Sequence, residues 1–204
     1  MLCGQEVPAA GHICAFFNSA QEKYDTLAPY FMDAIRAGDT VIDVMEERSR
    51  AEHVEALTRR GIDVEGGVET GRFRLSTCEQ VYKRAEKLDL DAVLEMLSET
   101  LEEARDEGRH VRTCGEMNWI SQNPAAMRRA MEYEVRVNEF VPTFECSLVC
   151  VYDLAHTPAH LMSDILATHP FAVINGRLRP NPYSVEPAEY IKMLETGGQF
   201  ARSA

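Results

Sequence analysis

The 204-residue sequence lacks any run of about 18 or more apolar residues, so it predicts no membrane-spanning helix. Its first eleven residues lack the charged and apolar regions of a signal peptide. Positive charge is also scarce, with 21 Lys and Arg against 33 Asp and Glu. Because a nucleic-acid-binding face needs clustered cations, direct binding to DNA or RNA is not expected. We expect a cytoplasmic protein.

A glycine-rich phosphate loop is missing as well. Residues 12–24 predict a strand, a turn and the start of a helix, which is where a nucleotide-binding protein would carry such a loop. Glycines are needed there because they let phosphates approach the backbone amides. Phe16, Phe17 and Asn18 occupy the position instead. We therefore expect no ATP hydrolysis by the ordinary route, and a sensor rather than a catalyst.

What the sequence does contain is a regular alternation of short apolar runs with amphipathic stretches. The runs are mostly continuous rather than alternating, which is typical of parallel strands covered on both faces. They span residues 12–17, 40–45, 73–77, 111–117, 147–154 and 171–175. The pattern predicts an α/β fold with a mostly parallel sheet between two layers of helices. Asn175-Gly176 favours a hairpin turn, so the sheet is expected to end in an antiparallel pair. Pro29 is expected to break or kink the first helix.

At 45% apolar content, a chain of this length suits one domain with a full core. We expect a single α/β domain over residues 11–195. The two ends, 1–10 and 196–204, are expected to be a flexible arm and a flexible tail.

Candidate ligand-binding residues lie on or just after the predicted strands, or on the helix over residues 124–140. In sheets of this kind, ligands bind at the carboxyl ends of the strands. One ring, a few polar groups and apolar walls make a small-molecule site. The alternative is that Trp119 fills the core and the carboxylates pair with arginines. The candidates are His12, Cys14, Phe16, Phe17, Asn18, Glu46, Glu47, Glu116, Trp119, Glu134, Asn138, Tyr152 and Asp153.

The six cysteines are expected to be thiols in a cytosolic protein. His12 and Cys14 share one face of their strand. With Cys114 and Cys150 they would form a metal or haem site of soft ligands. We favour the other interpretation, in which buried cysteines pack as small hydrophobes, so no metal and no cofactor is assigned.

The remaining histidines carry no predicted chemistry. His169-Pro170 and Asn181-Pro182-Tyr183 are interpreted as structural turns. Four further histidines are predicted at the surface: His53, His110, His156 and His160.

Several blocks of the sequence together resemble a known family. They are His-Ile-Cys-Ala-Phe-Phe-Asn-Ser at 12–19, Arg-Gly-Ile-Asp-Val at 60–64, Gly-Glu-Met-Asn-Trp at 115–119, Glu-Tyr-Glu at 132–134 and Cys-Val-Tyr-Asp-Leu at 150–154. In this order they resemble the MEDS domain, the methanogen/methylotroph DcmR sensory domain, over residues 12–194. The resemblance implies a core similar to RecA- and KaiC-like ATPases but without the phosphate loop. It also implies a small-molecule ligand, a separate regulatory protein or output domain as partner, and it allows a homodimer.

Two features sharpen the comparison with KaiC-like ATPases. Glu46 and Glu47 follow the second strand, as paired glutamates do in those enzymes, and Glu116 stands where a magnesium-binding Asp would end the fourth strand. A RecA-like strand order would bring the strands of Cys14, Cys114 and Cys150 together.

The first hypothesis is therefore a non-catalytic sensory domain for signal transduction or transcriptional regulation. One alternative is a degenerate nucleotide-binding or hydrolysing enzyme that uses Glu46 and Glu47. Others are a partner-switching interaction module and a metal- or haem-binding sensor.

Overall fold

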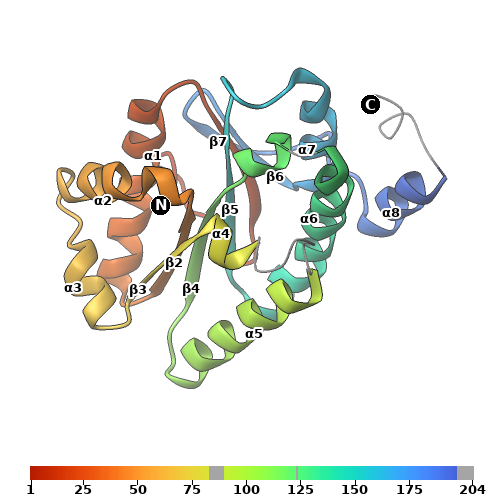
Figure 1. Ribbon diagram of the computed structural model, residues 1–204. Helices are drawn as coiled ribbons and strands as arrows, with labels where there is room; N and C mark the ends of the chain where they lie inside the picture. Colours follow the sequence, from red (N-terminus) through yellow and green to blue (C-terminus); the bar gives the residue numbers. More distant parts are fainter. Residues whose placement is uncertain (83–89, 123, 197–204) are drawn as a thin grey trace.

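The computed structural model describes residues 1–82, 90–122 and 124–196, and at its centre is one sheet of seven strands (Figure 1). The strand order is β3-β2-β4-β5-β1-β6-β7. All neighbouring strands are parallel except β6 and β7, which form an antiparallel pair. The predicted α/β fold and its final hairpin are thus confirmed. The strands are β1 (His12–Phe17), β2 (Thr40–Met45), β3 (Phe73–Thr77), β4 (Val111–Glu116), β5 (Ser147–Asp153), β6 (Phe171–Ile174) and β7 (Arg177–Pro180).

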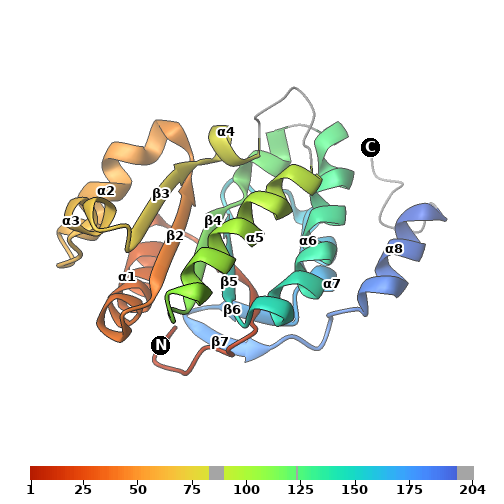
Figure 2. The same ribbon diagram turned by 90° about the horizontal axis from the view of Figure 1, so that it is seen from below.

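Helices cover both faces of the sheet (Figure 2). One face carries α1 (Ala20–Ala37), α2 (Arg50–Thr58) and α3 (Val64–Glu69). The other carries α4 (Cys78–Val81), α5 (Leu90–Asp106), α6 (Pro124–Phe144) and α7 (Met162–Thr168), and α8 (Pro187–Glu195) packs on the outside of α6 and α7. Three short 3-10 turns complete the described chain: η1 (Glu47–Ser49), η2 (Asn118–Gln122) and η3 (Ala159–Leu161). Cover on both faces explains why the strands are continuous apolar runs.

Side chains of β1 divide between two cores. Ile13, Ala15 and Phe17 belong to the core under α1, α2 and α3. Cys14 and Phe16 belong to the core under the other helices. This division follows from strand geometry, because successive side chains point to opposite faces of the sheet and every second side chain lies on the same face.

Strand β5 lies between β1 and β4, the neighbour relation that the family resemblance implied. In the register, Cys150 of β5 stands beside Cys14 of β1 on one side and beside Gly115 of β4 on the other. Cys114 is one residue out of step with Cys150, and this offset sends its side chain to the opposite face, into the core under α1.

Helix α1 continues through Pro29, so the predicted break does not occur. Ser19 caps the helix by accepting a hydrogen bond from the Glu22 amide. Proline costs the helix one hydrogen bond. Residues before and after it, including Leu27 and Phe31, pack into the same core, and their burial offsets that loss.

The first residues pack onto the domain. Leu2 is fully buried in the core under α1, and the terminal ammonium group pairs with Asp33. The flexibility predicted for residues 1–10 stays a prediction, and the predicted tail lies, apart from Thr196, outside the described residues. Within the described ranges, no helix has both the length and the apolar character needed to cross a bilayer.

Candidate metal centre and sheet-edge pocket

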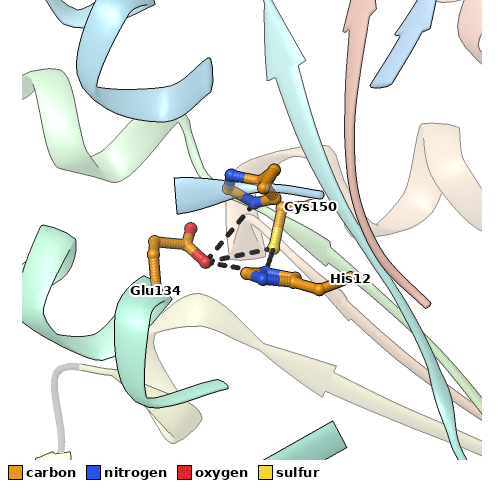
Figure 3. A group of neighbouring side chains, drawn as sticks. His12, Glu134 and Cys150 are labelled. Carbon is orange, nitrogen blue, oxygen red and sulfur yellow. Dashed lines mark hydrogen bonds and ion pairs between the residues drawn. The ribbon is translucent and has the colours of Figure 1, made fainter. Parts of the chain in front are cut away.

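Four side chains of metal-ligand type, from three elements and from the turn after α7, meet in the core between the sheet and α6. They are His12 of β1, Glu134 of α6, Cys150 of β5 and His169, which follows α7. All four residues are at most 2% exposed. One ligand atom from each lies within 4.8 Å of the other three. Figure 3 shows His12, Glu134 and Cys150 turned toward one another from different elements.

Glu134 is the centre of this cluster. Its Oε2 lies 3.1 Å from His12 Nε2, 3.5 Å from Cys150 Sγ and 3.6 Å from His169 Nε2. Cys150 Sγ is also 3.5 Å from His12 Nε2. The other carboxylate oxygen, Oε1, accepts a 2.8 Å hydrogen bond from the Tyr152 hydroxyl.

Backbone geometry explains why these residues converge. His12 begins β1 and Cys150 lies in the middle of β5, and both point toward α6. His169 caps the end of α7 with extended backbone, φ −122° and ψ 119°, which starts the turn into β6. Its ring lies against that of His12, with centroids 4.0 Å apart.

Each histidine is oriented by its other ring nitrogen. His169 Nδ1 donates to the Ile165 carbonyl at 2.7 Å, since a carbonyl oxygen can only accept. His12 Nδ1 faces Asn138 Oδ1 at 3.0 Å, while Asn138 Nδ2 donates to the Thr168 carbonyl at 2.7 Å. The amide is thereby fixed with its oxygen toward His12. Both histidines direct Nε2 into the cluster.

Burial sets the protonation of the cluster. Burial and the neighbouring His12 lower the pKa of His169 to about 3, so its ring is neutral at physiological pH. Burial raises the pKa of Glu134, but the adjacent histidines and the Tyr152 hydroxyl lower it by more, and the carboxyl group is ionised. Burial and the Glu134 carboxylate raise the pKa of Cys150 well above that of an ordinary thiol.

A second polar group lies on the other face of the sheet, at the carboxyl ends of β1, β4 and β5. Lys23 Nζ donates to Glu116 Oε1 at 2.6 Å, with the two side chains only 15% and 9% exposed. Glu116 Oε2 accepts from the Glu46 amide at 2.8 Å. A cavity of about 80 Å³ adjoins the ion pair. Its lining is Phe17, Ser19, Ala20, Lys23, Glu116, Asn118, Val151 and Asp153.

The ion pair between Lys23 and Glu116 shifts the pKa values of both groups. Burial lowers the pKa of Lys23, but Glu116 and Tyr24 raise it by more, so the net shift is upward. For Glu116 burial raises the pKa, and Lys23 and the Glu46 amide lower it overall. Both groups are therefore charged across the physiological range.

The remaining predicted candidates are dispersed. Trp119 is 5% exposed and stacks on Tyr82 in the core, with ring centroids 4.8 Å apart. Phe16 packs against Tyr152. Glu46 pairs with Arg48, and Glu47 is exposed. The other candidates lie near the edge: Asn18 donates to Glu22 at the start of α1, and Asp153 hydrogen-bonds to its own turn.

The buried cluster overlaps only partly with the soft-ligand set considered from the sequence. His12 and Cys150 are in it, whereas Cys14 donates to the Phe171 carbonyl and Cys114 faces the opposite core. Glu134 was a ligand candidate, and His169 had been interpreted as part of a structural turn. His169 stands just before a strand and His12 begins one, but the sequence does not show that these two strands, β6 and β1, are neighbours, so it gave no reason to pair the two histidines.

Comparison with known proteins identifies the family of this chain. No curated protein matches the chain significantly. The model of the MEDS family, the methanogen/methylotroph DcmR sensory domain, matches residues 11–170. This range contains both histidines, Glu134 and Cys150, and most of the sheet. The chain therefore belongs to the MEDS family of sensory domains.

Proposed function

We propose that this sensory domain is non-catalytic, binds a small polar molecule in the sheet-edge pocket and signals to a regulatory protein or output domain. The observation that carries the proposal is the Lys23–Glu116 ion pair beside the cavity. A cation held by a single carboxylate next to open space can exchange that carboxylate for an acceptor group of a ligand.

The size of the cavity defines the class of ligand. At about 80 Å³ the cavity is small. Phe17 fills the position of a phosphate-loop glycine, and Glu116 and Asp153 would repel a polyphosphate. These features favour a molecule of few heavy atoms and disfavour a nucleotide.

Exchange at Lys23 offers a route from ligand to partner. Glu116 is hydrogen-bonded to the Glu46 amide, and the Glu46 carbonyl accepts from Ser49, which ends η1. Release of Glu116 from Lys23 would alter this connection between β4 and the segment after β2. The exposed surface of α1, η1 and α2 would then present the signal to a cytoplasmic partner.

A titration of the ¹⁵N-labelled chain with formate, acetate and methanol tests the proposal by NMR. We expect saturable shifts at the amides of Lys23, Glu116 and Asn118 with at least one probe, and their loss in Lys23→Met. Lys192→Met on α8 is the control and should behave as the native chain. Shifts that persist in Lys23→Met, or ATP hydrolysis that is lost on Glu47→Gln, would overturn the proposal.

A further inference from the structure

We propose that His12, Glu134, Cys150 and His169 together bind one divalent metal ion of the zinc class. The sheet-edge pocket lies on the α1 face, whereas this cluster lies on the α6 face. The metal proposal therefore does not depend on the proposed ligand, and each can fail without the other.

Four of the six separations between the ligand atoms agree with a tetrahedral site. Zinc bonds of about 2.0–2.1 Å to nitrogen or oxygen and about 2.3 Å to sulfur place neighbouring ligands about 3.3 Å apart, or about 3.5 Å where sulfur is involved. The separations from Glu134 Oε2 are 3.1, 3.5 and 3.6 Å, and Cys150 Sγ lies 3.5 Å from His12 Nε2. The remaining pairs, which involve His169, do not exceed 4.8 Å.

His169 supplies independent support. Its Nε2 is fully buried and, within the described part of the chain, has no hydrogen-bond partner. Nδ1 carries the ring proton, because it donates to the Ile165 carbonyl, so Nε2 presents a lone pair. That lone pair faces the acceptor oxygen of Glu134 at 3.6 Å. A buried acceptor normally has a donor, and a cation between the two would satisfy both.

Charge and ligand type indicate the class of metal. One thiolate and one carboxylate carry two negative charges, which a divalent ion balances; entry of the ion displaces the thiol proton of Cys150. Two imidazoles, a thiolate and a carboxylate are all zinc ligands. With four protein ligands the coordination is complete, as in structural rather than catalytic zinc sites.

The surroundings have the second layer of contacts that metal ligands require. Asn138 holds His12, the Ile165 carbonyl holds His169, and Tyr152 holds the second oxygen of Glu134. A cavity of about 430 Å³, lined in part by His12, Asn138 and Pro170, lies beside the His12 end of the cluster. A bound ion would tie α6 and the end of α7 to β1 and β5.

Cobalt substitution tests the proposal. The full chain, produced without a metal-binding tag and stripped with a chelator, is titrated with Co²⁺ and followed by absorption. We expect one equivalent to give a near-ultraviolet thiolate-to-cobalt band and strong visible bands of tetrahedral cobalt, and one equivalent of Zn²⁺ to remove both. Absence of a thiolate band, or of a one-to-one end point, would overturn the proposal.

Variants identify the ligands. Cys150→Ser should lose the thiolate band, and His169→Gln should weaken zinc binding beyond the roughly 10–100-fold expected for Asn138→Ala, an outer contact. Cys146→Ser is the matched control, because Cys146 is equally buried in the same core but outside the cluster. A band that survives Cys150→Ser, or is lost in Cys146→Ser, would contradict the assignment. The native titration decides the claim even where a variant fails to fold.

Discussion

His169 Nε2 lies 3.6 Å from Glu134 Oε2, and the hydrogen bond from its other ring nitrogen to Ile165 leaves this atom with a lone pair and no proton. Two acceptors therefore face each other inside the core. The arrangement is unfavourable unless a cation lies between them, and the other predictions about the cluster follow from this relationship.

Zinc should stabilise the folded chain. An ion that binds the native state alone adds about 2.7 kcal/mol to the free energy of unfolding at a free concentration of 100 Kd. Urea unfolding of the stripped chain, with and without buffered Zn²⁺, measures the gain. Cys150→Ser should show little of it, and Cys146→Ser all of it. Equal gains in both variants would mean that zinc acts elsewhere.

Tyr152→Phe should destabilise the metal-free chain by about 1–3 kcal/mol, because it leaves Oε1 of the buried Glu134 carboxylate without its donor. Tyr30→Phe is the comparison, since Tyr30 is equally buried but donates at 3.3 Å to a neutral carbonyl. Tyr30→Phe should lower the free energy of unfolding by only about 0.5–1.5 kcal/mol. Urea unfolding at one pH provides both values, and a larger loss for Tyr30→Phe would argue against an ionised Glu134.

Lys23→Met should destabilise the chain by about 3 kcal/mol at pH 7, because Glu116 keeps its burial and loses its cation. The pH dependence should change as well. The pKa of Glu116 is lowered in the native protein, so its contribution is present above about pH 4.5, the usual glutamate value, and is lost as the pH falls through the native pKa.

Without Lys23 burial is opposed mainly by the hydrogen bond from the Glu46 amide, and the pKa of Glu116 should rise above its ordinary value. Its contribution then reverses sign, and stability should increase as the pH falls from 7 toward 4.5. Urea unfolding at several pH values compares the variant with the native chain, with Lys192→Met as control. Parallel pH profiles for all three proteins would show that the ion pair does not set the pKa of Glu116.

His53→Leu should be among the most damaging changes to stability. His53 was predicted at the surface, and that prediction is wrong: it is 2% exposed, contacts Asp43 Oδ2 at 2.7 Å and Tyr24 at 3.2 Å. Leucine would leave a buried carboxylate unpaired, a loss of about 3–5 kcal/mol. The double variant with Asp43→Leu should recover part of it. A cost below about 1 kcal/mol for His53→Leu alone would show that the contact between His53 and Asp43 does not stabilise the fold.

The strands could be predicted from the sequence, because buried parallel strands are continuous apolar runs. The two polar clusters could not, since their composition depends on register and on which helix face turns inward. An offset of one residue in the register places the side chains of Cys114 and Cys150 on opposite faces of the sheet. His53 lies on a helix with little apolar periodicity, so nothing local marks it as buried.

His169 shows a further limit. A histidine before a proline is typical of a turn, and the sequence carries no sign that the end of α7 lies against β1. The opposite case is Trp119, whose aromatic ring made it a ligand candidate although it packs on Tyr82 in the core. The type of a residue indicates what chemistry its side chain can perform. The face of the sheet or helix on which that side chain lies decides whether it can reach a ligand.

X-ray absorption at the zinc edge of the full chain, loaded with one equivalent of Zn²⁺, tests the central claim most directly. The four-ligand site predicts one sulfur at about 2.3 Å and three nitrogen or oxygen atoms at about 2.0–2.1 Å, with outer-shell scattering from two imidazoles. A shell without sulfur, or one with two or more sulfur atoms, would contradict the assignment to His12, Glu134, Cys150 and His169.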